Sequence, residues 1–346
     1  MKTVIKKWQL LSCKTRKRTV DLREEEFLSV GNRAMRKSRR YLEEARLPEG
    51  VSAVKGGAFA DCRRLYRVSL SETCGVGVGT EAFRGCIRLH EVLPFAGIVS
   101  IGERAFFGCT MLREIPMGEH LRAVGAYAFA HCASLEEAVL PSRVSSVGKG
   151  AFSDCTELIR FRAEEGITAL APELLRGCIS LCEVTLPEGL AEIPDGFLRD
   201  CSALEQLTLP TGTRRIGRQA MRGCRSLREV RAELGLTRIG RGAFRDTPAL
   251  TDVYLPHTVK RLGFGAFGFG RLKGTGREKV KLHVDTEYML RRLKRQLFFC
   301  GSYGRAEVIL DGKTIEERKR ERRRTSLDAA PTHLIDTTLD NKLDKK

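Results

Sequence analysis

Cysteine and histidine are the residues of this sequence that are best suited to chemistry. His131 directly precedes Cys132, which is the nearest approach of an imidazole base to a thiol nucleophile along the chain. Covalent catalysis would also need a third group that orients the base. Cys178 and Cys182 lie four positions apart and could offer two thiolates to a metal ion, but no matching Cys or His pair lies close to them in the sequence.

Two glycine-rich segments could be mistaken for phosphate-binding loops. One is Gly-Val-Gly-Val-Gly at residues 75–79, and the other is Gly-Phe-Gly at residues 263–265, which precedes Lys273. A phosphate loop needs a strand before it and the N-terminus of a helix after it, because backbone N–H groups must point at the anion. Neither segment has that setting, so we predict no nucleotide site.

The spacing of the cysteines gives most of them a structural explanation. Eight of the twelve cysteines recur with one step of 24 residues and then six steps of 23. They are Cys62, Cys86, Cys109, Cys132, Cys155, Cys178, Cys201 and Cys224. A thiol that returns at one place in every repeat is a small, mostly apolar residue of the interior. We therefore expect no catalytic residue, no metal ligand and no cofactor.

A longer pattern surrounds each of these cysteines. From Ile101 it reads Ile-Gly-x-x-Ala-Phe-x-x-Cys-x-x-Leu, and it restarts at Val124. An aromatic or large apolar residue keeps the same period. Its occupants are Phe59, Phe83, Phe106, Phe129, Phe152, Leu175, Leu198, Met221, Phe244 and Phe267. A fixed period of about 20 to 29 residues with regular leucines is the signature of a leucine-rich-repeat solenoid.

Each repeat also carries the pattern of one short strand. Residues 181–186 read Leu-x-x-Val-x-Leu, and residues 204–209 and 250–255 follow the same pattern. The first, fourth and sixth residues point inward, while the third and fifth point outward. One repeat cannot bury its own apolar side, so successive repeats must stack. The sequence predicts one continuous parallel sheet along a rod.

The pattern Ile-Gly-x-x-Ala-Phe-x-x-Cys-x-x-Leu-x-x-Val-x-Leu-Pro resembles the BspA-type, or Treponema-type, leucine-rich repeat over about residues 28–284. The resemblance implies an α/β-type repeat solenoid, a right-handed superhelix with one parallel sheet and about eleven units of 23 residues. It also implies binding of proteins or surfaces, often on bacterial or protist cells, and it brings no catalytic residues to this chain.

The two ends of the chain depart from the repeat pattern. The expected parts are an N-terminal basic segment or cap at 1–27, the leucine-rich-repeat solenoid at 28–270, a C-terminal cap at 271–317 and a basic, disordered tail at 318–346. Within the C-terminal cap we predict a strand at 280–284, a helix at about 287–299 and a hairpin at 306–315. Units at Leu170 and Ile193 replace Ala-Phe by Leu-Leu and Phe-Leu, which keeps the volume and changes the shape.

The net charge of +18 lies mainly at the ends. Residues 1–46 hold 14 Lys and Arg against 6 acidic residues, and residues 271–346 hold 20 against 12. A buried row of free thiols suits a reducing compartment, and the apolar run at 8–11 is too short for a signal peptide. We therefore expect a cytoplasmic protein without a transmembrane segment. A cell-surface protein with disulfides among the repeated cysteines is the alternative.

Two surfaces are candidates for binding a partner. The outer side of the predicted sheet carries mixed charge and tyrosine. Its candidate residues are Tyr66, Arg67, Arg160, Arg162, Glu183, Gln206, Arg231, Asp252 and Tyr254. The second candidate is an arginine ridge in two successive units. Its residues are Arg214, Arg215, Arg218, Arg222, Arg238, Arg241 and Arg245.

The chain is therefore interpreted as a non-enzymatic module or scaffold that binds a protein. Mixed charge on the sheet suits a protein partner, whose identity the sequence leaves open. A nucleic acid or an anionic surface, bound through the arginine ridge and the basic run at 318–324, is a second hypothesis. A surface adhesin is a third hypothesis. An acidic protein would also satisfy the arginines.

Overall fold

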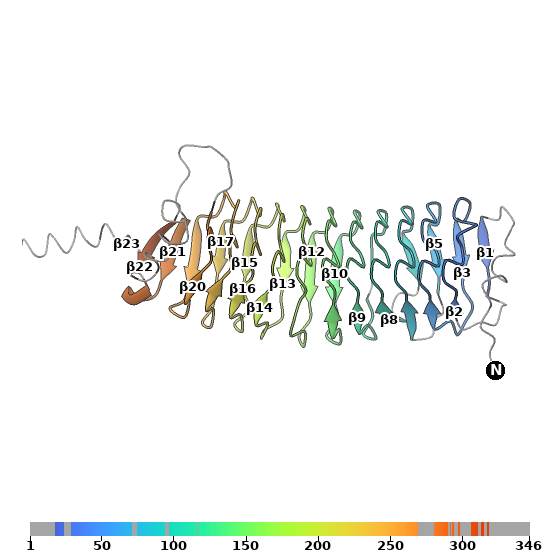
Figure 1. Ribbon diagram of the computed structural model, residues 1–346, viewed down its shortest axis with the longest axis horizontal. Helices are drawn as coiled ribbons and strands as arrows, with labels where there is room; N and C mark the ends of the chain where they lie inside the picture. The colour runs from blue at the N-terminus through green and yellow to red at the C-terminus, as the bar shows by residue number, and fades with distance from the viewer. Residues whose placement is uncertain are drawn as a thin grey trace, which may run out of the picture.

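The computed structural model describes residues 18–23, 29–70, 75–93, 97–115, 117–268, 280–289 and 306–310, with single residues at 291, 293, 297, 313, 314 and 317. These residues form a long rod in which successive turns of the chain stack along one axis (Figure 1). Strand β1 (Thr19–Asp21) lies at one end, and strand β22 (Ala306–Leu310) lies at the other (Figure 1).

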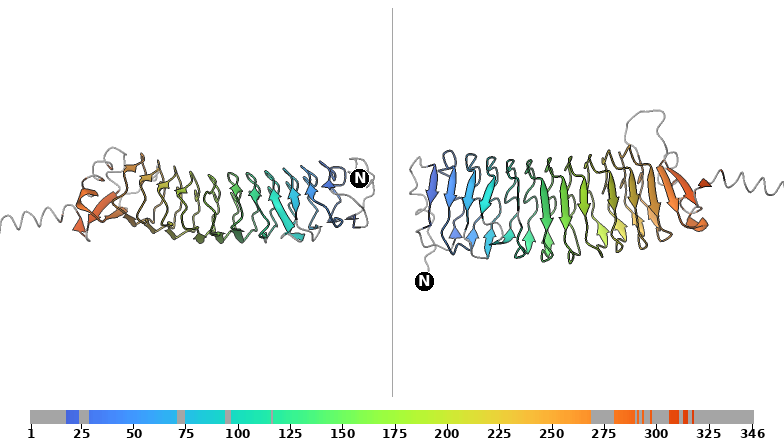
Figure 2. Two further views of the ribbon diagram at one scale, coloured as in Figure 1. Left: turned by 90° about the horizontal axis from the view of Figure 1, so that it is seen from below. Right: turned by 180° about the vertical axis from the view of Figure 1, so that it is seen from behind.

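Most turns contribute two short strands, which lie on opposite edges of the rod and run in opposite directions (Figures 1 and 2). The first row consists of β1, β3 (Glu44–Arg46), β5 (Arg67–Ser69), β7 (Glu91–Leu93), β10 (Glu137–Leu140), β12 (Arg160–Ala163), β13 (Glu183–Thr185), β15 (Gln206–Thr208), β17 (Glu229–Arg231), β19 (Asp252–Leu255), β21 (Val280–Val284) and β22. The second row consists of β2 (Ser29–Val30), β4 (Ala53–Val54), β6 (Val76–Val78), β8 (Ile98–Ile101), β9 (Ala123–Val124), β11 (Ser146–Val147), β14 (Glu192–Ile193), β16 (Arg215–Ile216), β18 (Arg238–Ile239) and β20 (Arg261–Leu262).

Strands within each row pair in parallel with the strand of the next turn. Equivalent residues face one another, as in the series Glu137, Arg160 and Glu183 across β10, β12 and β13. The predicted parallel-strand solenoid of about eleven turns is confirmed. The second row of strands was not predicted, because most of its strands have only two residues and leave no alternating pattern. Breaks also divide the first row into three sheets and the second row into two.

The interior is a continuous stack of equivalent side chains. The rings of Phe59, Phe83, Phe106, Phe129 and Phe152 lie nearly parallel, with centroids 5.1 to 5.4 Å apart. Such offset stacks add to the burial of the rings themselves. The spine of the rod is therefore built from one ring per turn.

The ring stack is interrupted where leucine replaces phenylalanine at positions 175 and 198. Two other rings fill the space: Phe161 points inward from β12, and Phe197 occupies the position that alanine holds in most turns. Phe161 meets the ring of Phe152 edge-on at 6.0 Å and that of Phe197 at 6.4 Å. The volume is kept by a change of orientation, as expected for a close-packed interior.

The repeated glycine after the second-row strand is required by the stacking. At Gly148, a β-carbon would lie 2.1 Å from the backbone nitrogen of Ala126 in the preceding turn. No side chain can occupy that space in the present packing of these two turns, so glycine is required at position 148. The glycine thus sets the spacing of the turns at this edge.

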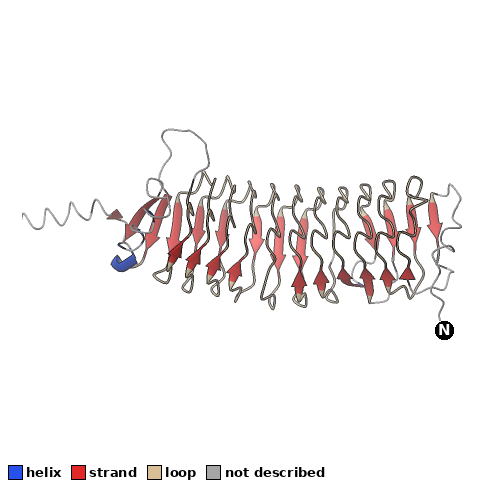
Figure 3. Ribbon diagram, viewed as in Figure 1, coloured by secondary structure: helices blue, strands red, loops and turns tan. Residues whose placement is uncertain are grey.

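The C-terminal end of the rod closes the stack. Strand β21 pairs with β19, β22 pairs with β21, and β23 (Lys313–Thr314) turns back antiparallel to β22. Residues 287–289, 291, 293 and 297 are helical and lie near the end of the rod (Figure 3). Their apolar members Met289, Leu293 and Leu297 are buried. Residues 1–17 and 318–346 lie outside the described residues.

Candidate binding surfaces

The repeated cysteines face the interior and are hydrogen-bonded. From Cys86 to Cys224, each thiol donates to the backbone carbonyl oxygen of the aromatic-position residue in the preceding turn, at 3.1 to 3.3 Å. Burial raises the pKa of the thiols, to about 12 at Cys155 and Cys224. Reactive cysteines need the opposite shift. These thiols are structural donors.

The residues that suggested chemistry in the sequence do not form a site. Cys132 is buried and donates to the carbonyl oxygen of Phe106, whereas the neighbouring His131 lies outside against the ring edge of Phe107. Cys178 is buried while Cys182 is exposed. Among the described residues, no group of three or more His, Cys, Asp or Glu side chains is placed to hold a metal ion.

The residues that were predicted for the sheet surface lie on the first-row strands, except Tyr66, which lies next to one. We call the outward side chains of these strands, with the residue just before each strand, the first-row face. Arg67, Arg160, Arg162, Glu183, Gln206, Arg231, Asp252 and Tyr254 lie on the strands, and Tyr66 directly precedes β5. Because the register is kept from turn to turn, these residues form rows along the rod. Their role in binding is a proposal that the following sections develop.

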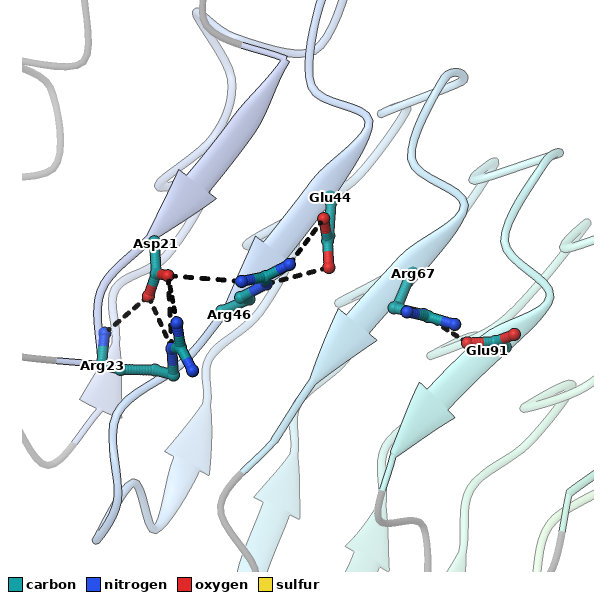
Figure 4. A network of polar contacts seen from close by, with 6 residues as sticks. All are labelled: Asp21, Arg23, Glu44, Arg46, Arg67 and Glu91. Carbon is teal, nitrogen blue, oxygen red and sulfur yellow. Dashed lines mark hydrogen bonds and ion pairs between the residues drawn. The ribbon is translucent and has the colours of Figure 1, made fainter.

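At the N-terminal end, the first-row face carries two separate groups of ion pairs (Figure 4). Arg46 bridges Glu44, at 3.0 Å, and Asp21 in the preceding turn, at 3.6 Å. Arg67 donates to Glu91 one turn further on. The hydrogen bond from Arg67 lowers the pKa of the Glu91 carboxyl. Opposite charges in neighbouring turns therefore neutralise each other here.

At the C-terminal end, the first-row face carries an exposed aromatic cluster. The guanidinium of Arg231, on the preceding strand, lies 5.0 Å from the ring centroid of Tyr254. The ring of His283, on the following strand, stacks on the Tyr254 ring with the two centroids 4.4 Å apart. His283 Nε2 lies 2.7 Å from Oδ1 of Asp252. We call Arg231, Asp252, Tyr254 and His283 the aromatic cluster. It is preformed by contacts between three successive first-row strands.

The predicted arginine ridge lies on two kinds of segment. Arg214, Arg215 and Arg238 lie at the second-row strands, where β16 and β18 place Arg215 opposite Arg238. Arg218, Arg222, Arg241 and Arg245 lie on the segments that lead from a second-row strand to the next first-row strand. We call the outward side of these segments the turn face. The predicted ridge therefore spans both the second-row strands and the turn face.

Several ridge arginines already have carboxylate partners. Arg215 lies 3.1 Å from Glu192 and 3.6 Å from Asp195. Asp246 receives Arg222 at 3.2 Å and Arg245 at 3.7 Å. The stacked arginines are thus partly neutralised within the chain, which the number of arginines in the sequence does not reveal.

A groove of about 720 Å³ runs along the turn face. Arg199, Arg218, Arg241 and Arg245 line it, and glycine forms part of its floor at positions 196, 242 and 265. Glu173 and Asp195 also line the groove, as does Phe264. Arg218 and Arg241 make no ion pair with any residue that the structure describes. These features make the groove an anion-binding candidate.

Sequence analysis missed parts of both surfaces. Arg199 was overlooked, although it occupies the same place in its repeat as Arg176, Arg222 and Arg245, and the period of 23 could have revealed it. His283 was overlooked because β21 follows β19 after more than one repeat length, so the period does not align it with Tyr254. Phe264 was read only as part of a glycine-rich segment.

The family model for the BspA type leucine rich repeat region matches this chain in six copies, over residues 4–92, 28–159, 76–202 and 158–272. The chain belongs to this family. A leucine-rich-repeat protein of T. pallidum is 36% identical, with 48% of this chain and 80% of that one covered and a TM-score of 0.43. A leucine-rich-repeat protein from Bacteroides ovatus is 18% identical, with 82% and 88% covered and a TM-score of 0.52, which supports the fold.

A comparison with curated proteins finds no match. The structure adds one observation on membranes: in the part of the chain that it describes, no helix has the length and apolar character needed to cross a bilayer. The family match establishes the stacked repeat and names no partner. The function of this BspA-type protein must therefore be argued from its own surfaces.

Proposed function

We propose that this chain is a non-enzymatic module that binds a protein through its first-row face. The observation that carries the proposal is the in-register arrangement of outward side chains on this face. Charged, amide and aromatic groups of successive turns form rows that are fixed by the parallel pairing of the strands. A rigid surface binds with little cost in conformational entropy.

The charges of the first-row face favour a protein over a polyanion. One register position reads Glu44, which is buried, then Arg67 and Glu91 in the first turns, and Glu137, Arg160 and Glu183 in the middle. Acidic residues outnumber basic ones in this row. A phosphate backbone would be repelled by such a row, whereas a protein surface can present both signs of charge.

The aromatic cluster is the best-formed anchor on this face. Tyrosine and arginine are enriched among the residues that dominate protein interfaces. Tyr254 is 37% exposed and is held between Arg231 and His283, so its ring is oriented before a partner arrives. We place the centre of the interface at this cluster, with the polar residues of β15 beside it and the charged residues of β12 and β13 further along the rod.

The polyanion hypothesis has less support. Arg215 and Arg222 are paired with carboxylates of this chain, so they offer less charge to a nucleic acid than their number suggests. Exposed aromatic side chains are sparse around them, and base stacking on aromatic rings supplies much of the affinity of single-strand binders. We keep nucleic acid as an outcome of the experiment below.

The cytoplasm remains the proposed location. All nine cysteines of the described residues are free, and eight of them are buried. Unpaired thiols in this number suit a reducing compartment. Secretion of the protein is the alternative. Mapping of free and oxidised cysteines by mass spectrometry in protein isolated from native cells distinguishes the two locations.

The proposed function is tested by affinity capture from an extract of the native cells after nuclease treatment. Wild-type chain is compared with Arg231→Ala/Tyr254→Ala, which removes the anchor, and with Arg143→Ala/Tyr41→Ala, which removes an arginine and a tyrosine elsewhere on the surface. We expect one defined protein that the anchor variant retains at least about tenfold less, since anchor residues contribute about 2 kcal/mol or more. Equal capture by both variants, or capture of nucleic acid alone, would overturn the proposal.

A further inference from the structure

The groove on the turn face is a second surface with its own chemistry, separate from the first-row face. It follows the rod across the turns that contain Glu173, Asp195, Arg218, Arg241 and Phe264. These five turns are separated by four steps of about 4.8 Å, so the groove is roughly 19 Å long. An extended peptide of about six residues has the same length.

The two central cations of the groove are available to a ligand. Arg218 and Arg241 have no carboxylate partner among the described residues, and Arg218 is exposed. Arg199 and Arg245 lie nearer to carboxylates of the chain, since their Nε atoms are 3.3 Å from Asp200 and 3.7 Å from Asp246. Planar guanidinium groups of this kind recognise carboxylates by paired hydrogen bonds.

The ends of the groove limit what can bind. At one end, Glu173 is held by Lys149 at 3.3 Å and Asp195 accepts a hydrogen bond from the backbone N–H of Arg218 at 2.6 Å. At the other end, Phe264 is 63% exposed, and Arg241 lies 5.8 Å from its ring centroid. A uniform polyanion that followed the groove would meet two carboxylates. A short segment with acidic residues only at its centre would place no negative charge next to these two carboxylates.

A hollow nearer the N-terminus shows the contrast. It lies on the same turn face, has a volume of about 610 Å³ and is lined by Arg84 among others. Arg84 is paired with both Asp61, at 3.0 Å, and Glu81, at 3.3 Å. Carboxylates of the chain thus already pair with the Arg84 guanidinium in that hollow. The groove around Arg218 and Arg241 differs because its central cations are left without such partners.

We propose that this groove binds a short acidic protein segment of about six residues in extended conformation. Its central carboxylates pair with Arg218 and Arg241, and an apolar or aromatic residue contacts Phe264. The glycine floor leaves room for the segment's backbone. This inference does not depend on the first-row face, because the two surfaces share no residue.

The probe for the test is a fluorescent six-residue peptide with lysine at one end, three central glutamates, a serine and phenylalanine at the other end, synthesised in both directions. Its binding is measured by fluorescence anisotropy at about 0.05 and 0.3 M salt, since pairing of exposed charges weakens as salt rises. A twelve-residue oligothymidylate is measured in parallel as the phosphate-bearing competitor.

Two variants of different kinds test the groove. Arg218→Glu/Arg241→Glu reverses the central charges, and its matched control Arg113→Glu/Arg143→Glu makes the same change of net charge at exposed positions elsewhere. Gly242→Tyr fills the floor without changing the charge. A tyrosine fits the backbone there, because Tyr127 holds the equivalent place in its own turn with φ of 55°, close to the 60° of Gly242. A β-carbon at Gly242 would be 3.6 Å from its nearest neighbour, which is an ordinary contact.

We expect one direction of the peptide to bind, with affinity reduced at least about tenfold in both groove variants and less than about twofold in the control, a difference of at least about 1 kcal/mol. Equal losses in the groove variants and the control would overturn the proposal, as would no binding of either peptide. Tighter binding of oligothymidylate, lost in the same variants, would also overturn it in favour of a phosphate site. Arg231→Ala/Tyr254→Ala should bind the peptide normally, which separates this test from that of the first-row face.

Discussion

Replacement of Phe106 by alanine tests the ring stack that forms the spine of the rod. The ring is fully buried, and its centroid lies 5.1 Å from that of Phe83 and 5.2 Å from that of Phe129. A phenylalanine buries about 150 to 250 Å², and about 25 cal/mol per Å² gives about 4 to 6 kcal/mol for the whole side chain. Since alanine retains the β-carbon, we expect Phe106→Ala to lower the free energy of unfolding by about 4 kcal/mol.

The neighbouring residue Phe107 provides a matched control. It is half-buried on the surface and contacts the ring of His131 edge-on at 5.0 Å. We expect Phe107→Ala to lower the free energy of unfolding by about 1 kcal/mol or less.

Urea unfolding followed by far-ultraviolet circular dichroism measures both variants. With a urea dependence of about 3 kcal/mol per molar, Phe106→Ala should lower the midpoint by about 1.3 M. Hydrogen exchange should show the loss first in the turns next to the substitution, because each repeat contacts only its neighbours. Similar midpoints for Phe106→Ala and Phe107→Ala would refute the account of the core.

Three further predictions concern the thiols, the close turns and the C-terminal end. At pH about 8, only Cys182 of the nine described cysteines should react with a thiol reagent in the folded protein, because burial raises the pKa of the others, as for Cys155 at about 12. Mass spectrometry of the labelled protein measures this reaction, and rapid labelling of the buried thiols would contradict the prediction. Gly148→Ala should lower the free energy of unfolding by about 3 kcal/mol or more, because its β-carbon would lie 2.1 Å from a backbone nitrogen, whereas Gly31→Ala has no atom within 4 Å of its β-carbon and should be tolerated. Burial raises the pKa of Asp252, but hydrogen bonds to its carboxylate outweigh burial and hold the pKa below 3.8. The stabilising contribution of the Asp252 carboxylate is therefore present above about pH 4 and is lost as pH falls through the lower pKa of the folded state. Asp252→Asn should lower the thermal midpoint at pH about 6 and have little effect at pH about 2. An effect of the substitution that grows on acidification would contradict this prediction.

Much of the fold could be predicted because it depends on a few residues that return with a fixed period. The cysteine, the ring and the glycine each occupy one place per turn, and each place has one physical requirement. The inward and outward orientation of side chains along a strand could also be predicted, since Arg160 and Arg162 alternate with buried residues in β12. The second row was not visible because strands such as β14 have two residues and show no alternation.

The surfaces were less predictable, because they depend on contacts between turns. The sequence placed Arg231 and Tyr254 on the outer side of the sheet, but it gave no sign that His283 joins them, since the segment before β21 exceeds one repeat. It also grouped Arg215 with Arg218, but of these two only Arg218 lines the groove. Charge pairing across turns, as between Arg222 and Asp246, reduces the charge that composition suggests.

The central claim is that the first-row face meets a protein partner, and site-specific photo-crosslinking in native-cell extract tests it most directly. A photoreactive residue is placed at Tyr254, and in separate chains at Phe264 on the turn face and at Tyr41. We predict a single protein adduct that forms from Tyr254 at an efficiency at least about tenfold above that from Tyr41, as expected for the centre of an interface. Equal adducts from Tyr254 and Tyr41, or adducts from Tyr254 that contain only nucleic acid, would contradict the account.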